Sequence, residues 1–491
     1  MVNAAQNAAR YAAATLSGRG NGGAVSGTRL RSMPASPGLA RPALKEAPGG
    51  NDDEFTRAAM TAAPRKLRIA QVAPPLERVP PVAYGGTERI VHGLATELAA
   101  RGHEITVFAS GDSDVPGTLV PTVDKALRPA GIEGDASGWF LATVQAVLER
   151  ASEFDIIHSH LEWWSIPLAR MTPVPMVSTF HGRLDLPWSE RLFEDAPEGL
   201  VAISRSQASA HPKVPWTIIH NGLVLDQAPF KTDRSDAFCF VGRVDPEKGI
   251  VEAMDIAALT SRPLRLAAKV GNLPEQRAYY ENVFRPALKR ASRNVEFLGE
   301  LSPEDRDQLF AESYGTLMPG AWPEPFGLVS IESLACGTPI LARRVGALPE
   351  VIREGVDGFF GDDAMGMAFH ADALETLDRR AIRERVIERF SAARMTDRYE
   401  ELYARMIGHV GRSPKPSGAG FTIAPAPGRP GQLDRQPGPF GAQQGVSSLR
   451  PQAQPSRPAS PSPANPSADD ATDNDAGVPR SVRSPAATGR S

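Results

Sequence analysis

The segment VGRVDPEKG, Val241–Gly249, carries the charges best suited to a phosphate-bearing ligand. It lies between a predicted strand and a predicted helix, which places it in a loop at the carboxyl end of a sheet. Arg243 can bind two phosphate oxygens at once, and Lys248 adds a mobile positive charge. Loop arginines and lysines are commonly just solvated, but this pair could neutralise a diphosphate.

A second loop, Tyr84-Gly85-Gly86-Thr87, follows the first predicted strand and comes directly before a helix. Gly85 and Gly86 have no side chains, so a ligand could approach the backbone closely. The helix N-terminus offers free N–H groups and the positive end of the helix dipole, which suit an anion. An ordinary tight turn is the alternative.

Two carboxylates, Glu324 and Glu332, flank the start of a third predicted helix in EPFGLVSIE. The rise of a helix separates them by roughly 8–12 Å, enough to reach different parts of one ligand. Glu332 lies on a mainly apolar face, where it needs hydroxyl partners. The alternatives are a capping Glu324, a salt-bridged Glu332, or a glycoside hydrolase that uses both as acid and base.

Histidines end two further predicted strands. His181 in STFHG would face the same crevice as the loops above, unless it is a structural histidine satisfied by its neighbours. His158 and His160 share one side of a strand end and could bind a metal, but no third ligand is evident, so we predict no metal site. The G-x-G-x-x-G match at Gly18–Gly23 has no strand before it and is treated as accidental.

Short strand-like runs alternate with helical ones from about residue 64 to residue 411, the pattern of parallel sheets covered by helices. One series begins at LRIAQVAP and another at DAFCFVGR. We therefore predict two doubly wound α/β halves joined near Leu223–Thr232, with a long helical tract over Asp378–Met406.

The composition excludes several classes of protein. The 491 residues have a net charge of -3, which lacks the basic footprint of nucleic-acid binding. Hydrophobic runs are too short to span a bilayer or to serve as a secretory signal. Cys239 and Cys336 both lie in apolar runs, as expected of reduced, buried thiols. These features predict a cytoplasmic protein.

The chain has 44 glycines and 45 prolines, and 15 of the prolines lie in the stretch 412–491. The stretch 412–491 is rich in Pro, Gly and Ser and cannot bury enough apolar surface to fold, so we predict a disordered tail. The Ala/Gly/Ser-rich segment 1–64 is predicted to be a disordered leader. Five arginines without an acidic residue in 1–45 leave an organelle transit segment as its alternative.

The separated motifs together resemble glycosyltransferase family 4, the retaining nucleotide-sugar transferases of group 1 with the GT-B fold. The resemblance covers about 67–406 and rests on YGGTER, DIIHSH, STFHG, HNG, GRVDPEKG, VEFLG, EPFGLVSIE, ACGTPILA and GALPEVIREGVDGFF. It implies two Rossmann-like domains. We place the acceptor domain at 65–225, the donor domain at 226–395, and a helix that crosses back to the first domain at 396–411.

The resemblance also assigns roles on the donor side. Arg243 and Lys248 would bind the diphosphate, helped by Gly85, Gly86 and the backbone around Phe326, Gly327 and Leu328. Glu324 would bind hydroxyls of the donor sugar, Glu332 those of the ribose, and His181 would line the reaction centre. His181, Glu324, Arg243 and Lys248 are the predicted catalytic set.

The implied reaction transfers a hexose from a nucleotide sugar, UDP-glucose or another UDP-hexose, to an acceptor hydroxyl. The anomeric configuration would be retained, and no metal or other cofactor would be needed. The segment HLEWWSI (His160–Ile166), above all Trp163, is predicted to line the acceptor site together with Arg183 and Asp185. The acceptor is open among a sugar, a lipid-linked glycan, a pterin or another small metabolite, and peripheral membrane contact is open too. A non-catalytic sugar-nucleotide-binding scaffold, whose tail recruits partners, is a third interpretation of the whole chain.

Overall fold

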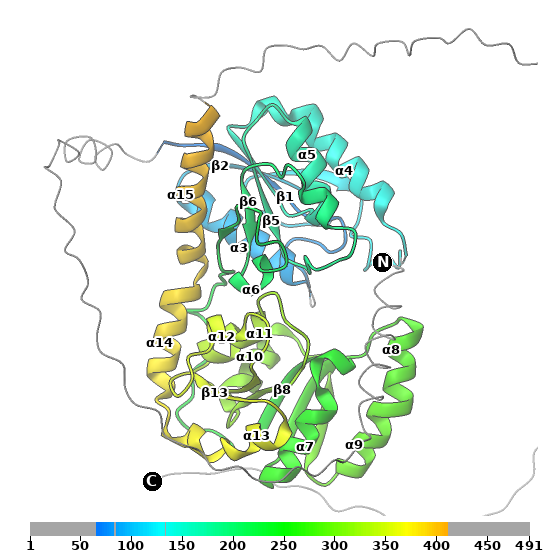
Figure 1. Cartoon of the computed structure of the whole chain (residues 1–491), viewed down its shortest axis with the longest axis vertical. Helices are drawn as coiled ribbons and strands as arrows, with labels where there is room; N and C mark the ends of the chain where they lie inside the picture. Colours follow the sequence, from blue (N-terminus) through cyan, green and yellow to red (C-terminus); the bar gives the residue numbers. More distant parts are fainter. Residues whose placement is uncertain (1–64, 83–84, 133, 411–491) are drawn as a thin grey trace, which may run out of the picture. The chain divides into compact units, whose positions relative to one another are not determined.

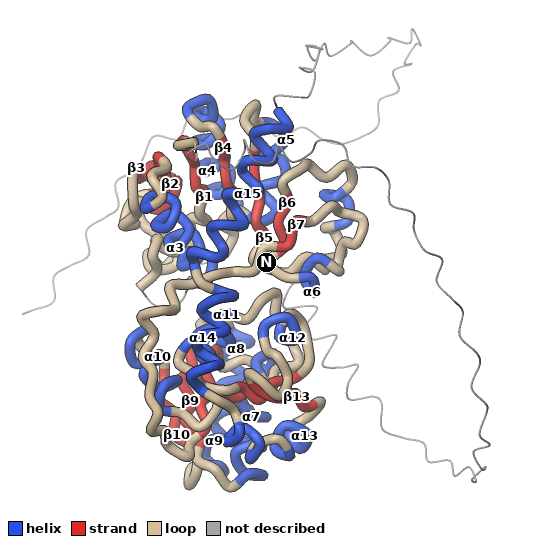
Figure 2. The backbone as a smooth tube through the Cα atoms, turned by 90° about the vertical axis from the view of Figure 1, so that its left-hand side faces the viewer, coloured by secondary structure: helices blue, strands red, loops and turns tan. Residues whose placement is uncertain are grey.

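The computed structural model describes residues 65–82, 85–132 and 134–410, which form two parallel sheets covered by helices (Figure 1). The predicted leader at 1–64 and the predicted tail at 412–491 lie outside the described residues, as does Tyr84. Figure 2 shows the strands of each sheet between their helices. The doubly wound architecture was predicted correctly for both halves.

The first sheet has the order β3-β2-β1-β4-β5-β6-β7, with all of its strand pairs parallel. In such an order the chain reverses direction across the sheet between β1 and β4, and ligands bind beyond the carboxyl ends of the strands at that point. The strands are β1 (Arg68–Val72), β2 (Glu104–Ser110), β3 (Thr118–Val123), β4 (Ile156–Ser159), β5 (Met176–Phe180), β6 (Leu200–Ala202) and β7 (Thr217–Ile218).

The second sheet repeats this arrangement with the order β10-β9-β8-β11-β12-β13. Its reversal point lies between β8 and β11, directly before the loop that contains VGRVDPEKG. The strands are β8 (Phe238–Arg243), β9 (Leu264–Lys269), β10 (Val295–Gly299), β11 (Thr316–Met318), β12 (Ile340–Arg343) and β13 (Gly358–Gly361).

Helices connect the strands of both sheets. The first domain contains α3 (Gly86–Ala100), α4 (Ser137–Arg150), α5 (Ser165–Met171) and α6 (Arg205–Ala208). The second contains α7 (Ile250–Thr260), α8 (Pro274–Tyr279), α9 (Arg285–Ala291), α10 (Pro303–Glu312), α11 (Leu328–Ala335), α12 (Leu348–Val351), α13 (Ala364–Phe369) and α14 (Arg379–Phe390), and α15 (Ala392–Val410) follows.

Burial explains why these segments adopt their conformations. The central strands β4 and β5 are buried at every position, as expected of parallel strands covered on both faces. In α3, Ile90, Val91, Leu94 and Leu98 recur at helical spacing and are fully buried against the first sheet. Gly102, with a φ of 91°, ends that helix as the sequence predicted.

The helical tract predicted over Asp378–Met406 is interrupted, and this prediction was wrong in one respect. Ser391 is extended between α14 and α15 because it pairs with Leu223 of the linker between the domains. The Leu223 N–H donates to Phe390 O (3.0 Å), and the Ala392 N–H donates to Leu223 O (2.8 Å). A Cβ on Gly222 would lie 2.3 Å from Ser391 O, so the HNG motif needs its glycine here.

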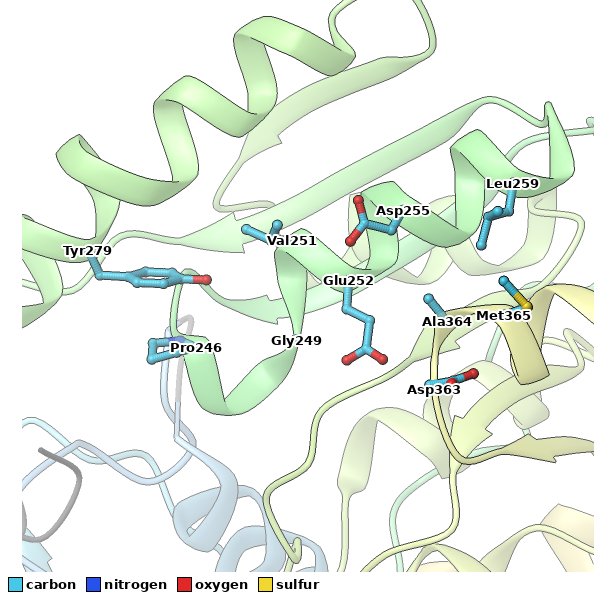
Figure 3. Close-up of a pocket in the computed structure, with 10 residues that line it drawn as sticks. All are labelled: Pro246, Gly249, Val251, Glu252, Asp255, Leu259, Tyr279, Asp363, Ala364 and Met365. Atoms are coloured by element: carbon cyan, nitrogen blue, oxygen red, sulfur yellow. The ribbon is translucent and has the colours of Figure 1, made fainter. Parts of the chain in front are cut away.

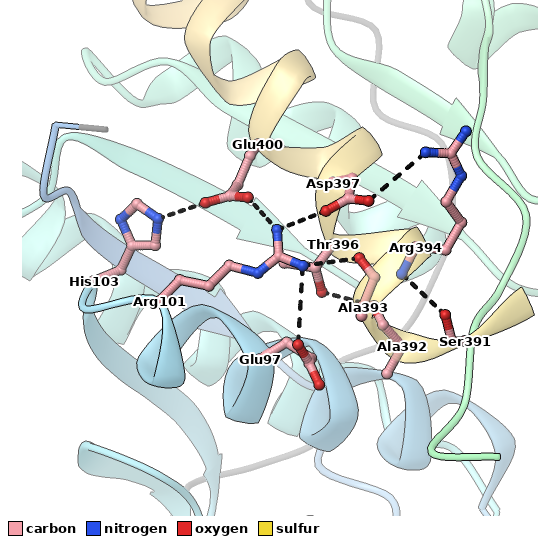
Figure 4. Close-up of polar contacts among 10 residues, drawn as sticks. All are labelled: Glu97, Arg101, His103, Ser391, Ala392, Ala393, Arg394, Thr396, Asp397 and Glu400. Carbon is pink, nitrogen blue, oxygen red and sulfur yellow. Dashed lines mark hydrogen bonds and ion pairs between the residues drawn. The ribbon is translucent and has the colours of Figure 1, made fainter. Parts of the chain in front are cut away.

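Helix α15 packs on α3 of the first domain, although it follows α14 of the second (Figure 1). An ion-pair cluster stabilises this contact at the C-terminal end of α3 (Figure 4). Arg101 bonds the carboxylates of Asp397 (2.9 Å) and Glu400, and Glu400 also contacts His103 Nε2 at 2.9 Å. The predicted boundary between 395 and 396 falls inside α15, which begins four residues earlier.

Candidate active site

The VGRVDPEKG loop leaves β8 at the reversal point of the second sheet. Asp245 caps the short helix Pro246–Lys248 by accepting the Glu247 N–H at 3.0 Å. The Arg243 guanidinium lies 3.9 Å from Asp245 Oδ2, and its buried Nε has no partner within the described part of the chain. Arg243 therefore keeps hydrogen-bonding capacity for an anion.

Lys248 and Glu324 meet across this loop, 76 residues apart in sequence. The Lys248 ammonium donates to a Glu324 carboxylate oxygen, and both side chains are partly exposed. The sequence predicted the two residues for different parts of one ligand, and the structure brings them into direct contact. A ligand phosphate would compete with this carboxylate for the ammonium.

The N-termini of α3 and α11 also meet at the site. Gly85 precedes α3, and Gly327, in the left-handed region with a φ of 84°, precedes α11. A Cβ on Gly86 would lie 3.2 Å from Leu328 Cδ1, so the first residues of the two helices are in contact distance. Their free N–H groups and the positive ends of both dipoles form a region suited to an anion. Phe326 itself is buried, with His220 and Phe390 around its ring.

Glu332 is a buried carboxylate held by two arginines. Arg89 of α3 donates to it, and Arg306 Nη1 lies 3.2 Å from the same oxygen. The two guanidinium groups outweigh the effect of burial and lower the pKa of Glu332. This is the salt-bridged alternative of the sequence analysis; ribose binding by Glu332 stays a prediction. Arg89 ends the YGGTER motif, but its pairing with Glu332, 243 residues away in sequence, was not predicted.

His181 follows β5 and is half-buried, in contact with the histidine at the end of β4. His181 Nε2 lies 2.9 Å from His160 Nδ1, and the two rings stack at 5.2 Å. Burial lowers the pKa of His181 to about 3, so its imidazole is neutral. His158 and His160 are bonded to Tyr403, Thr179 and Gln71, and the described residues contain no group of three or more potential metal ligands.

Glu162 lies in the HLEWWSI segment predicted to line the acceptor site, but the sequence analysis did not single it out. One of its carboxylate oxygens accepts the backbone N–H groups of His181 (2.9 Å) and Gly182 (3.1 Å). The other oxygen is buried and has no hydrogen-bond partner among residues that the structure describes. Burial raises the pKa of Glu162 to about 7, and its φ of 53° lies in the left-handed region. Strain and desolvation of this kind are typical of functional sites but leave no sequence signal.

The predicted acceptor-site residues surround the loop after His181. Arg183 donates twice to Asp185, at 2.6 Å each, and its guanidinium lies 4.5 Å from the ring centre of Trp322. This pairing lowers the pKa of Asp185. Trp163 packs edge-on against Trp188 at 4.7 Å in an aromatic cluster. Arg183 thus reaches the loop that carries Glu324, whereas Trp163 mainly packs.

A hollow of about 580 Å³ lies on the second domain between α7 and α13 (Figure 3). Pro246 and Gly249 border it, but Arg243, Lys248, Glu324 and Glu332 do not. Its polar lining is mainly acidic, with Glu252, Asp255 and Asp363, which makes it unsuited to a diphosphate. We therefore place the candidate site at the two sheet reversal points, outside this hollow.

Two family models match the chain one after the other. Residues 84–227 match Glycosyltransferase Family 4, and residues 225–391 match Glycosyl transferases group 1. The chain belongs to the family 4, group 1 glycosyltransferases. The first match includes His181 and the strands β2 to β7 of the first sheet, and the second includes Arg243, Lys248 and all strands of the second sheet.

Named relatives of this glycosyltransferase are themselves glycosyltransferases. It is 28% identical to glycogen synthase of Mycobacterium tuberculosis H37Rv over 335 residues, which cover 57% of the chain and 79% of the relative. It is 27% identical to D-inositol 3-phosphate glycosyltransferase of Mycobacterium marinum over 449 residues, 77% of the chain and 94% of the relative.

Solved structures show that the glycosyltransferase has the GT-B fold predicted from its sequence. AviGT4, a glycosyltransferase involved in avilamycin A biosynthesis, aligns with a TM-score of 0.54 at 23% identity, over 70% of this chain and 98% of that one. Sucrose-phosphate synthase from Thermosynechococcus elongatus aligns with a TM-score of 0.54 at 19% identity, over 70% and 100%. Among the described residues, no helix is long and apolar enough to cross a membrane.

Proposed function

We propose that this glycosyltransferase moves a hexose from a UDP-sugar to an acceptor hydroxyl with retained configuration and without a metal ion. The observation that carries the proposal is the meeting of the α3 and α11 N-termini beside the Arg243 and Lys248 loop. Two helix ends and two cations form a site for a leaving diphosphate that needs no divalent ion to balance its charge.

The donor half of the site would act on the leaving group. As the bond from the anomeric carbon to the diphosphate breaks, negative charge grows on the phosphate oxygens and the sugar gains oxocarbenium character. Arg243 and Lys248 would stabilise that charge. The diphosphate would displace Glu324 from the Lys248 ammonium, and the released carboxylate would accept hydrogen bonds from the sugar hydroxyls.

The acceptor half would complete the transfer on the same face of the sugar. The acceptor oxygen forms its bond to the anomeric carbon from the side that the diphosphate leaves, and its proton passes to a departing phosphate oxygen. His181, neutral and half-buried, would contact the sugar without adding charge. Exclusion of water between the two halves would prevent donor hydrolysis.

The paired states of the two carboxylates favour transfer over glycoside hydrolysis. A hydrolase needs one carboxyl group that stays protonated as the acid. Glu332 has a lowered pKa between two arginines, and Glu324 is paired with Lys248. Burial of Glu332 is therefore outweighed by its two arginines and does not keep it protonated as such an acid.

Proteins similar to this chain differ in the acceptor and in the nucleotide base of the donor. The chain's relatives are named for glycogen and for D-inositol 3-phosphate, which differ in size and charge. Proteins that share the fold were solved with UDP and glucose in one case and with ADP and acarbose in another. We place the enzyme in the cytoplasm, consistent with its two buried free thiols.

The proposal is tested by incubating the full chain with UDP-glucose, EDTA and a panel of hydroxyl acceptors. We expect UDP release together with a product whose anomeric configuration, read by proton NMR coupling, equals that of the donor. An inverted product would contradict retention, and activity that returns only with added Mg²⁺ would contradict metal independence. Rapid cleavage of aryl glycosides with intact UDP-glucose would favour the hydrolase.

A further inference from the structure

A continuous chain of buried hydrogen bonds leads from His181 to helix α15. It crosses three strands of the first sheet, and all of its members beyond His181 are fully buried. In order, the chain runs through His181, His160, Gln71, Tyr403, His158, Thr179 and Tyr399.

The first links connect the site to the helix. His181 Nε2 lies 2.9 Å from His160 Nδ1, and His160 Nε2 lies 3.1 Å from Gln71 Oε1. The Gln71 amide NH₂ donates to the Tyr403 hydroxyl at 3.2 Å. Gln71 is on β1 and Tyr403 on α15, 332 residues further along the chain.

The remaining hydrogen bonds continue from the Tyr403 hydroxyl to Tyr399. The Tyr403 hydroxyl lies 2.7 Å from His158 Nδ1, and His158 Nε2 lies 2.7 Å from Thr179 Oγ1. The threonine hydroxyl then meets the Tyr399 hydroxyl at 2.9 Å. Every polar atom named in the chain therefore has a partner, as burial requires.

The side chains that form this series of hydrogen bonds are all neutral. Burial lowers the pKa values of His158 and His160 well below the usual value and that of His181 to about 3. It also raises the pKa values of Tyr399 and Tyr403. Each imidazole therefore carries one ring proton, so one of its nitrogens donates and the other accepts.

In a neutral chain of this kind the hydrogen bonds can all be donated in one direction or all in the other. The orientation of the Gln71 amide decides which direction is present. With Oε1 towards His160, the His160 Nε2–H must donate, so His160 Nδ1 accepts the Nε2–H of His181. The Nδ1 atom of His181 then keeps a lone pair. If the amide were reversed, every bond would reverse, and His181 Nδ1 would carry the proton instead.

We propose that Gln71 is a positioning residue that fixes the tautomer of His181 through His160, and that Tyr403 of α15 supplies the hydrogen-bond partner for the other end of the Gln71 amide. His181 then presents an acceptor nitrogen, suited to a hydroxyl of the sugar or of the acceptor. Because α15 continues from α14 of the donor domain, a helix that leaves the donor domain sets the ring that faces the reaction. The effect on turnover rests on the proposed function, whereas the tautomer does not.

The test is long-range ¹H–¹⁵N NMR of the histidine rings in the full chain. The signals of His181 are assigned as those that disappear in the variant His181→Asn. We expect the wild type to show the Nε2–H form of His181. Gln71→Met removes both ends of the amide, and Tyr403→Phe removes its acceptor, so both variants should populate the two tautomers. Their kcat should fall about tenfold or more while KM for the donor changes less than about threefold.

Tyr314→Phe is the matched control. It removes a fully buried tyrosine hydroxyl that donates to Ala371 O at 3.0 Å in the second domain, away from the chain. It should lose a similar amount of thermal stability but keep the His181 tautomer and kcat. An unchanged His181 tautomer in folded Gln71→Met and Tyr403→Phe would overturn the proposal, as would mixed tautomers with wild-type kcat. Absence of transfer by the wild type would contradict the proposed function, while the NMR result would still decide the role of Gln71.

Discussion

The two halves of the active site differ in charge. The proposed donor half contains Arg243, the Lys248 and Glu324 pair, and Glu332 between two arginines, so ion pairs predominate there. In the acceptor half, His181 and the histidines behind it are kept neutral by burial. A diphosphate leaving group requires fixed positive charge, whereas sugar hydroxyls require donors and acceptors in defined directions. Each half therefore has the electrostatics that its part of the proposed reaction needs.

This contrast predicts that the donor half is most sensitive to loss of charge. Arg243→Ala or Lys248→Ala should lower kcat/KM by about 100-fold or more, about 3 kcal/mol, because each cation stabilises the leaving group. Steady-state kinetics with UDP-glucose measure this. Arg293→Ala, at an exposed turn of the same domain, is the control and should leave kcat/KM within about twofold. Wild-type kinetics in both cation variants would remove the donor site from this loop.

Loss of the buried Glu332 carboxylate should mainly lower the stability of the fold. Glu332→Gln leaves Arg89 and Arg306 without their shared counter-charge, and we expect the free energy of unfolding to fall by about 3 kcal/mol. Urea denaturation measures it. The pair Arg344 and Glu354 is about half exposed, so Glu354→Gln should cost less than about 1 kcal/mol. Equal losses in the two variants would show that the Glu332 cluster is not a buried ion-pair site.

Glu324→Gln should separate sugar binding from nucleotide binding. The amide binds sugar hydroxyls less strongly, so kcat/KM should fall about tenfold, near 1.4 kcal/mol. The change also frees Lys248, so UDP should bind at least as tightly as it does to the wild type. Isothermal titration calorimetry with UDP, beside the kinetics, tests both parts. Equal weakening of UDP binding and turnover would place Glu324 at the nucleotide instead of the sugar.

The smallest effect is expected from the isolated carboxyl group beside His181. The pKa of Glu162 is raised from 4.5 to about 7, so the protonated form favours the fold. Its contribution is fully present below pH 4.5 and is lost as the pH rises through 7. Glu162→Gln keeps an oxygen for the two N–H groups and should largely remove the loss of stability between pH 5 and pH 8. Denaturation curves that shift in parallel with pH for both proteins would contradict this.

Much of the fold could be predicted because its signals are local. Apolar strand runs, the helix stop at Gly102 and the glycine loops before α3 and α11 are readable within about ten residues. The break at Ser391 was not, because it depends on pairing with Leu223, far away in sequence. The same reason explains why Arg89 beside Glu332 and Tyr403 beside Gln71 escaped prediction: each contact joins residues more than 200 positions apart.

The most direct test of the nucleotide-sugar site is thermal unfolding of the full chain in EDTA with UDP, GDP, ADP or dTDP. A ligand at 100 times its Kd adds about 2.7 kcal/mol to the free energy of unfolding. We predict selective stabilisation by UDP that is lost in Arg243→Ala and kept in Arg293→Ala. No stabilisation by any of the four nucleotides, or equal stabilisation of Arg243→Ala, would contradict the assignment of the donor site to the Arg243 and Lys248 loop.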